Sequence, residues 1–264
     1  MTSTESQTTS LAELNRVFWD TNADTFFEQD WLKTFTEQLT RFLRTQGPNL
    51  GLRPRDPANP VRLLDYACAY GGASWHPQPV LMINQALAPF VDEILGIDIA
   101  PAIVDRFNTC ATELGYSPAQ AHAVAGDLAT DGTLAAEGGF DVVIISMALH
   151  HLEDPRGMLG LLARRVRPGG VLIAVEGANV MEAGMGARDQ DGHEQFVHEV
   201  LKTINRHVEF GEELFRGWFE GVGCDVKRFV YIENKEVSHI PEKIVGKPGG
   251  LDRKMVIAAS VRSV

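Results

Sequence analysis

Five apolar runs recur along the middle of the chain, and each is followed by polar or small residues. They lie at residues 61–65, 93–98, 119–127, 140–152 and 167–176. Runs of this kind are typical of parallel strands that are buried on both faces. Because segments with helix-start signals lie between them, the pattern predicts strands that alternate with helices in an α/β fold.

The chain before the first run has a helical pattern. Apolar residues at spacings of three and four, in residues 11–18 and 31–43, predict two amphipathic helices. Residues 47–60 hold four prolines and predict a linker into the first strand. Residues 1–10 are rich in Thr and Ser without an apolar core, so we expect a disordered tail there.

The chain after the fifth run is less regular. Residues at about 177–210 show no clear strand pattern. Residues 211–223 predict a last helix, with acidic residues in its first turn. Residues 224–232 and 254–261 predict the final two strands, and residues 240–253 the loop that joins them.

The turn after the first strand, at residues 65–71, is made largely of small residues. The short side chains of Ala67, Ala69 and Gly71 let a ligand lie almost on the backbone. The stretch lacks the glycine set G-x-G-x-x-G that cradles a pyrophosphate in dinucleotide sites, which disfavours a nicotinamide-dependent dehydrogenase. The turn therefore predicts a cofactor site that holds no phosphate, at the carboxyl end of the strand.

An acidic residue, Asp98, ends the second run. One carboxylate can accept hydrogen bonds from both hydroxyl groups of a ribose, and an acidic residue at this place does so in adenosine-binding α/β folds. We therefore expect Asp98 to bind the ribose of an adenosine cofactor.

Five motifs, taken in order, resemble those of class I S-adenosylmethionine-dependent methyltransferases. The resemblance is to the small-molecule branch, including enzymes of ubiquinone and menaquinone biosynthesis and their fungal relatives. Residues 65–71 resemble the first motif, D-x-A-C-G-x-G, with Ala69 in place of its middle glycine. Residues 98–108, the Gly126-Asp127-Leu128 turn, residues 140–152 and residues 167–176 resemble the motifs that follow. If position 69 needs a left-handed backbone, its alanine costs roughly 1–2 kcal/mol.

The resemblance implies a fold, a cofactor and a set of site residues. The implied fold is a Rossmann-like, seven-stranded, mostly parallel sheet with an antiparallel last strand, helices on both faces and an N-terminal helical lid. The implied division is a lid and linker at residues 11–60 and a methyltransferase domain at residues 61–264, with a substrate-facing insert at about 177–210. The implied cofactor is S-adenosylmethionine, with Asp127 against the adenine amino group, although Asp127 could instead only cap a helix or turn. The implied cofactor-binding residues are Asp65, Ala67, Cys68, Ala69, Gly71, Asp98, Ile99, Asp127, Leu128, Ser146 and Met147. The implied lid or substrate residues are Phe18, Trp19, Phe27 and Trp31, each of which could equally be a packing residue.

Four histidines are candidates for a catalytic base. His150 and His151 follow the fourth run, and His193 and His198 lie in the expected insert. An imidazole can accept a proton near neutral pH. Either residue of the first pair could instead serve only shape and hydrogen bonding, because methyl transfer can proceed by alignment alone. His193 and His198 are five residues apart, one more than in the zinc signature H-E-x-x-H, so the pattern disfavours a metal site.

Composition and charge limit the kinds of molecule that the protein is expected to bind. The 264 residues carry a formal net charge of −11, which disfavours a nucleic-acid or anionic-membrane surface but not a basic peptide. Three cysteines, Cys68, Cys110 and Cys224, form no C-x-x-C pair and indicate no disulfide framework, as in a reducing compartment. Neither a signal peptide nor an apolar run of roughly 20 residues is present, so we expect a cytoplasmic protein, monomeric or homodimeric, without a membrane span.

Two functions of different classes remain from the sequence. The first is a methyltransferase that moves a methyl group to an oxygen, nitrogen or carbon atom of a small-molecule acceptor by in-line displacement. The second is a protein that binds S-adenosylmethionine without methylating, and uses it as structure or as an electrostatic catalyst. The substituted first motif and the lack of an obvious base keep the second function open.

Overall fold

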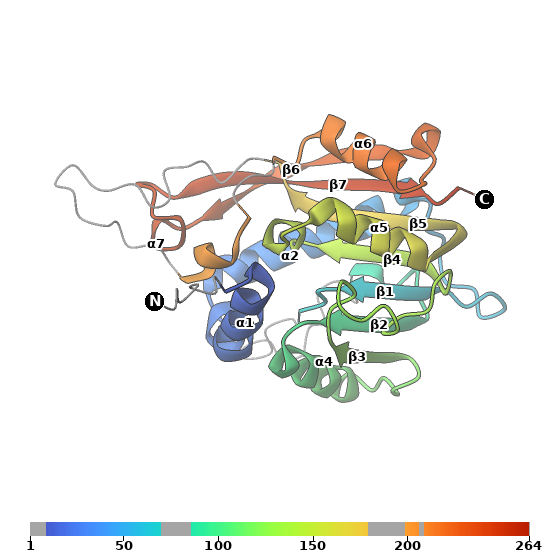
Figure 1. The fold of residues 1–264 in the computed structure, drawn as a ribbon, viewed down its shortest axis with the longest axis horizontal. Helices are drawn as coiled ribbons and strands as arrows, with labels where there is room; N and C mark the ends of the chain where they lie inside the picture. Colours follow the sequence, from blue (N-terminus) through green and yellow to red (C-terminus); the bar gives the residue numbers. More distant parts are fainter. Residues whose placement is uncertain (1–8, 70–85, 179–198, 206–208, 264) are drawn as a thin grey trace, which may run out of the picture.

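A single mixed sheet organises the protein. The computed structural model describes residues 9–69, 86–178, 199–205 and 209–263. Within these residues, seven strands lie in the order β3-β2-β1-β4-β5-β7-β6 (Figure 1). The strands are β1 (Arg62–Tyr66), β2 (Glu93–Asp98), β3 (Ala121–Ala125), β4 (Phe140–Ser146), β5 (Val166–Gly177), β6 (Val230–Ile240) and β7 (Leu251–Val261). Strands β1 to β5 are parallel, and β7 runs antiparallel to both β5 and β6. The predicted Rossmann-like sheet with an antiparallel last strand is confirmed.

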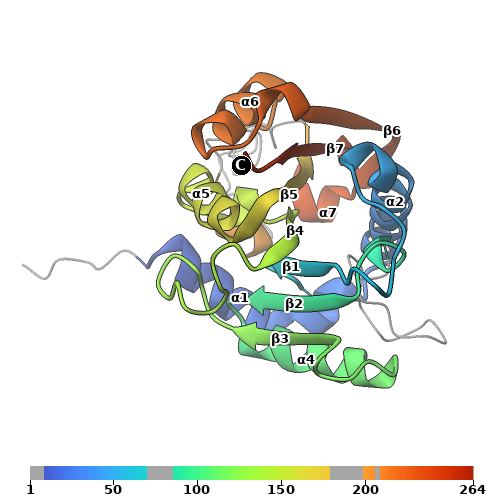
Figure 2. The same cartoon turned by 90° about the vertical axis from the view of Figure 1, so that its right-hand side faces the viewer.

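Helices cover both faces of the sheet, because the central strands are apolar on both sides. The helices of the described residues are α1 (Leu11–Phe27), α2 (Asp30–Gln46), α4 (Pro101–Glu113), α5 (Pro155–Arg165), α6 (Glu212–Gly221) and the short α7 (Glu242–Val245). Helices α2 and α4 pack on one face and α5 and α6 on the other (Figure 2). The start of helix α5 follows from its sequence, since the Asp154 side chain accepts a hydrogen bond from the Gly157 N–H and Pro155 occupies the first turn.

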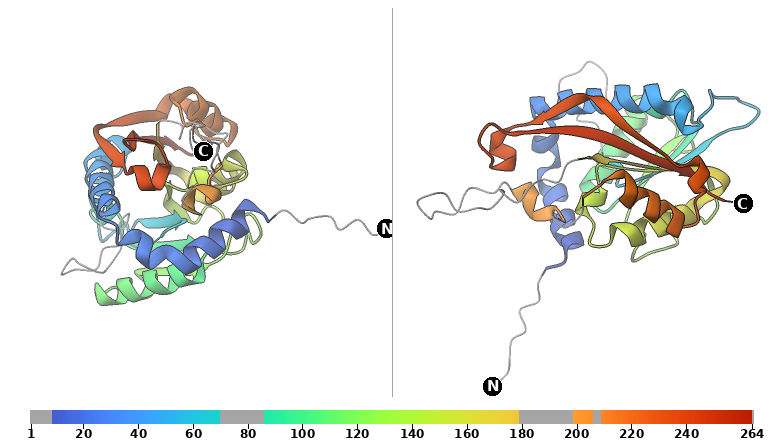
Figure 3. Two further views of the ribbon diagram at one scale, coloured as in Figure 1. Left: turned by 90° about the vertical axis from the view of Figure 1, so that its left-hand side faces the viewer. Right: turned by 90° about the horizontal axis from the view of Figure 1, so that it is seen from above.

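Helix α1 lies across the edge at which the parallel strands end, alongside α4 (Figure 3). At one end, the Asn15 amide nitrogen lies 3.1 Å from the His151 carbonyl oxygen and 3.0 Å from that of Thr203. Further along, the Asp20 carboxylate accepts a hydrogen bond of 2.9 Å from the Ala102 N–H in the first turn of α4. These bonds hold α1 over the carboxyl edge, between the segments that follow β2 and β4.

Two strands end differently from the prediction. The fourth apolar run was expected to continue as a strand to residue 152, but β4 stops at Ser146, and Leu149–His151 form a 3-10 turn, η2. Met147 has φ +54°, which no strand accommodates. The strand expected at residues 224–232 was also misplaced, because residues 226–228 form the 3-10 turn η4 and β6 instead runs from Val230 to Ile240. The strand expected at residues 254–261 lies within β7. The outer half of β6 is largely polar, so it carries no apolar alternation that could predict it.

Two further 3-10 turns complete the described elements. Gly47–Leu50 form η1 at the start of the predicted linker, and Glu199–Thr203 form η3 beside α1. Helix α7 lies in the predicted loop at residues 240–253. The β6–β7 hairpin extends past the carboxyl edge of the sheet to α7 and contacts α2 (Figure 1). The hairpin therefore adds a wall beside the edge that α1 covers.

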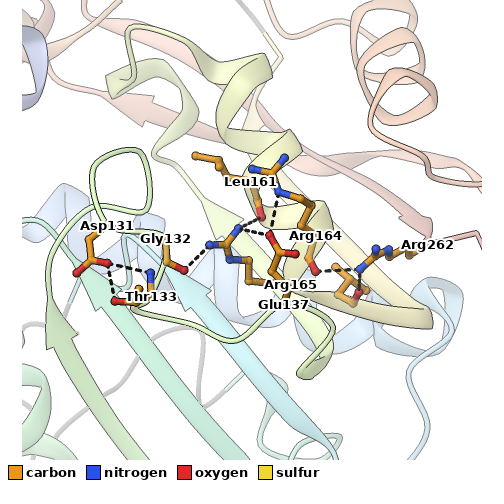
Figure 4. Close-up of polar contacts among 9 residues, drawn as sticks. Asp131, Gly132, Thr133, Glu137, Leu161, Arg164, Arg165 and Arg262 are labelled. Carbon is orange, nitrogen blue, oxygen red and sulfur yellow. Dashed lines mark hydrogen bonds and ion pairs between the residues drawn. The ribbon is translucent and has the colours of Figure 1, made fainter.

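The loop between β3 and β4, which carries Asp127, is tied to helix α5 (Figure 4). The Arg165 guanidinium is buried and donates to the Gly132 carbonyl at 2.7 Å and to the Leu161 carbonyl at 3.1 Å. Arg164 pairs with Glu137 at 3.2 Å, an exposed contact of small energetic value. The buried Arg165 thus ties the loop at Gly132 to helix α5.

Candidate active site at the carboxyl edge

A cavity of about 610 Å³ opens at the carboxyl edge of the sheet. The residues that follow β1, β2 and β4 form its floor, and α1, α2, η3 and α7 supply its walls. Ligand sites of parallel α/β sheets lie at this edge, next to the point where the strand order reverses. Here the order reverses between β1 and β4, so the cavity occupies the place expected for a cofactor.

The turn after β1 brings backbone to the cavity surface. Ala67 and Ala69 line the cavity with left-handed backbones, at φ +54° and +48°. Between them, the Cys68 N–H donates to the Ile97 carbonyl at 3.1 Å, and burial raises the pKa of its thiol well above the usual value. A protonated, buried thiol is a packing group, so the part of this turn that can face a ligand is backbone and methyl groups.

Replacement of Ala69 by glycine is expected to stabilise the protein slightly. A left-handed alanine costs roughly 1–2 kcal/mol, and glycine relieves this at an entropic cost of roughly 0.5–1 kcal/mol. Thermal unfolding should show a higher midpoint for Ala69→Gly and, as a matched control, a lower midpoint for Ala102→Gly in the exposed first turn of α4. A lower midpoint for Ala69→Gly would show that its methyl group contributes more by packing than its backbone costs in strain.

Asp98 joins the turns that follow β1 and β2. Its two carboxylate oxygens accept hydrogen bonds from the N–H groups of Ala69 and Ala100, each at 3.1 Å. Burial raises the pKa of Asp98 to about 6, although the backbone N–H groups oppose the shift. The carboxylate lines the cavity, and each oxygen keeps a second lone pair for a ligand.

Asp127 is held by Tyr66 on the neighbouring strand. The Tyr66 hydroxyl donates to Asp127 Oδ1 at 2.6 Å, and the Ala129 N–H donates to the same oxygen at 2.8 Å. Burial and the nearby carboxylate raise the pKa of Tyr66, which keeps it a donor. Because one oxygen of Asp127 is occupied, the other is the acceptor that remains for a ligand. Tyr66 also lines the cavity and was not predicted, although it stands inside the first motif.

His150 is paired with a buried carboxylate. Its Nδ1 lies 2.8 Å from Glu176 Oε2 at the end of β5, and its backbone N–H donates to Glu176 Oε1 at 3.3 Å. Burial raises the pKa of Glu176, but His150 and Arg253 outweigh this and lower it below its usual value. An ionised acceptor at Nδ1 holds the imidazole proton there, which leaves Nε2 as the basic atom.

His151 is held in the neutral form. Its Nδ1 lies 2.9 Å from the Thr203 carbonyl oxygen, to which a neutral ring donates. Burial lowers the pKa of His151 well below its usual value, and the positive charge of Arg253, together with that of His150 when its ring is protonated, adds to this lowering. The ring also meets Trp19 edge to face, with 5.8 Å between centroids. His151 is therefore a neutral part of the cavity wall that contacts α1.

Aromatic side chains of the N-terminal helices close the cavity. Trp19 stacks on Phe27 with 5.7 Å between centroids, and Trp31 meets Phe26 edge to face at 6.0 Å. All four line the cavity. Phe18 does not line it, since it is buried in a cluster with Leu32, Ile240 and Ile244. The covering helices thus present an apolar surface to whatever binds below.

The structure gathers most of the predicted site residues in this one cavity. Those that line it are Ala67, Cys68, Ala69, Asp98, Ile99, Asp127, Ser146, Met147, His150, His151, Trp19, Phe27 and Trp31. Asp65 and Leu128 do not line it: Leu128 packs in the core, and Asp65 is 1% exposed with burial raising its pKa well above the usual value. Gly71, His193 and His198 lie outside the described residues.

Besides Tyr66, the polar residues Glu176, Asn15 and Arg253 of the site had no role in the sequence prediction. Glu176 ends an apolar strand, as Asp98 does, and this shared pattern could have singled it out. Asn15 and Arg253 belong to segments before and after the motifs, where no spacing marks them. Among the described residues, no group of three or more His, Cys, Asp or Glu side chains is placed to hold a metal ion. No described helix has the length and apolar character needed to span a bilayer.

Known proteins share this architecture. A family of methyltransferase domains matches residues 81–174. The geranyl diphosphate C-methyltransferase of Streptomyces coelicolor superposes with a TM-score of 0.61 at 12% identity, covering 97% of this chain and 100% of that chain. The protein has the class I methyltransferase fold. The cyclase SpnF shares this methyltransferase fold, with a TM-score of 0.60 at 16% identity over 97% of this chain and 98% of that chain.

Two curated relatives are similar over part of their length. An uncharacterised methyltransferase of Schizosaccharomyces pombe is 29% identical over 119 residues, which are 44% of this chain and 38% of the relative. A ubiquinone biosynthesis O-methyltransferase of Xanthomonas oryzae pv. oryzae is 26% identical over 161 residues, which are 56% of this chain and 60% of the relative. The chain thus spans less than two thirds of the length of each relative.

Proposed function

We propose that this protein transfers a methyl group from S-adenosylmethionine to an oxygen, nitrogen or carbon atom of a small-molecule acceptor. One observation carries the proposal: within a methyltransferase fold, a single cavity joins the acidic turns after β2 and β3 to a histidine with an ionised partner. The mostly apolar walls favour a small organic acceptor over a nucleic acid.

The residues at the floor of the cavity fit an adenosine cofactor. Asp98 and Asp127 each offer a carboxylate oxygen, which suits ribose hydroxyl and adenine amino donors. Ser146 Oγ is buried beside the cavity without a hydrogen-bond partner among the described residues, so a ligand group could satisfy it. The polar side chains at this end of the cavity are acidic or neutral, which suits a nucleoside that carries no phosphate.

Bound S-adenosylmethionine would supply an electrophilic methyl carbon on a positively charged sulfur. The chain's own contribution is to hold the acceptor atom in line with that carbon and to exclude water. The aromatic side chains of α1 and α2 provide the exclusion. Where the acceptor carries a hydroxyl or protonated amine, His150 Nε2 would take the proton while Glu176 stabilises the imidazolium that results.

A second function is kept because of one structural neighbour. The cyclase SpnF has the same fold and a name that denotes no methyl transfer. A protein of this kind would bind S-adenosylmethionine and leave it unchanged. Consumption of the cofactor separates the two functions.

Binding followed by product analysis tests the proposal. The purified chain should bind S-adenosylmethionine in a calorimeter. Incubation with candidate acceptors should then yield S-adenosylhomocysteine and a product heavier by one methylene unit. Binding without consumption across a broad acceptor panel favours the second function, and no binding contradicts both.

A further inference from the structure

A buried arginine faces the cavity at the end opposite the acidic turns. Arg253 is 5% exposed, comes from β7 and lines the cavity. Its Nε has no hydrogen-bond partner in the described part of the chain. Within the described residues it forms an ion pair with Glu176, 3.9 Å from Nη2, but the same carboxylate oxygen already lies 2.8 Å from His150 Nδ1. A buried guanidinium with so little compensation is costly unless a ligand completes its hydrogen bonds.

The backbone is shaped to hold this guanidinium. Gly177 ends β5 beside β7, and a Cβ at that position would overlap Nε and Cζ of Arg253. A residue other than glycine would therefore displace the arginine. The glycine at position 177 thus leaves the space that the guanidinium occupies.

The charged groups next to Arg253 leave part of its positive charge unbalanced, so one further negative group can bind there. Glu176 offsets part of the arginine charge, and His151, whose pKa Arg253 helps to lower, is neutral. The walls near this end are apolar and include Ile240, Ile244 and Ile204. A planar monoanion on an apolar body matches this set, because a guanidinium binds a carboxylate through two parallel N–H bonds.

We propose that Arg253 binds a carboxylate of the acceptor, so that the protein acts on carboxylic acids with an apolar body. This inference rests on the proposed function, because it places the carboxylate of the acceptor at the other end of the same cavity. A carboxylate is already ionised at neutral pH and needs no base. If His150 serves as the base, the methylated atom therefore belongs to a second group of the same acceptor.

A matched pair of probes tests the inference on the unmodified protein. Calorimetry in the presence of saturating S-adenosylhomocysteine should show 4-phenylbutyrate binding at least about tenfold more tightly than 4-phenylbutanamide, which is the ratio that about 1.4 kcal/mol represents. Equal affinities, or no binding of the acid in the millimolar range, overturn the inference. The S-adenosylhomocysteine titration reports separately on the proposed function, which fails if that ligand does not bind.

Variants then assign the preference to one side chain. Arg253→Gln should bring the acid and amide affinities within about twofold, and Arg253→Lys should keep part of the preference because it keeps the charge. Lys254→Gln is the matched control, since Lys254 is the next residue of β7 and its exposed side chain pairs with Glu233. An undiminished preference in a folded Arg253→Gln protein contradicts the assignment. If that variant does not fold, the comparison of the two probes on the unmodified protein still decides the inference.

Discussion

Turnover is expected to fall by roughly 10²–10⁴-fold when His150 is replaced by alanine, the range typical for loss of a general base. Affinity for S-adenosylmethionine should change little, because His150 follows β4, whereas Asp98 and Asp127, the acidic residues proposed for the ribose and adenine, follow β2 and β3. The effect should therefore appear in the single-turnover rate, measured with saturating cofactor, and not in the calorimetric dissociation constant.

Two further variants test whether His150 acts as a base or only fills space and forms hydrogen bonds. Glu176→Gln keeps the size of the partner but removes the charge next to His150 Nδ1, so its rate should lie between the wild-type and His150→Ala rates. His151→Ala removes a neutral ring whose Nδ1 is bonded to the Thr203 carbonyl, so its rate should fall less than that of His150→Ala. If all three variants turn over at near-normal rates, alignment alone accounts for catalysis and His150 is not the base.

Asp98→Ala is expected to weaken S-adenosylmethionine binding by at least about tenfold. Hydrogen bonds to a charged group contribute roughly 1.5–3 kcal/mol each, and 1.4 kcal/mol corresponds to a factor of ten in affinity. The substitution also removes the acceptors of the Ala69 and Ala100 N–H groups, so thermal unfolding should accompany the calorimetry. Asp105→Ala, an exposed change in α4, is the control and should leave affinity within about twofold.

The pH dependence of cofactor binding gives an independent measure of Asp98. Since burial raises its pKa to about 6, the ionised form that accepts from two hydroxyls is lost as pH falls below that value. Each further unit of pH should weaken binding by about tenfold, and Asp98→Asn should abolish the dependence. A flat profile between pH 5 and pH 7 in the unmodified protein would remove Asp98 from the ribose site.

The sequence predicts most of the residues that line the cavity near Asp98 because this part of the cavity is built from local features. Asp98 ends a strand, the small residues follow a strand, and parallel strands bring their carboxyl ends to one edge. The substitution of alanine for the middle glycine of the first motif is also a local feature. Ala69 has the left-handed backbone that a glycine at this position would adopt without strain. Each of these inferences needed only neighbours along the chain.

The other end could not be predicted because it depends on contacts between distant segments. Glu176 becomes a partner of His150 only when β4 and β5 are paired, and Asn15 meets His151 only when α1 lies across the edge. Arg253 reaches the cavity because β7 lies beside β5 and Gly177 leaves room for it. In each case the residue type is ordinary, and only the tertiary arrangement brings it to the site.

The β6–β7 hairpin has a consequence for how proteins of this fold diverge. The matched family region, residues 81–174, contains Asp98, Asp127 and His150, whereas Trp31 precedes it and Arg253 follows it. Substitutions in α1, α2 and the hairpin can therefore remodel the acceptor wall without touching the turns that hold Asp98 and Asp127. Descendants of one ancestral gene could in this way exchange acceptors repeatedly while inheriting the nucleoside end unchanged.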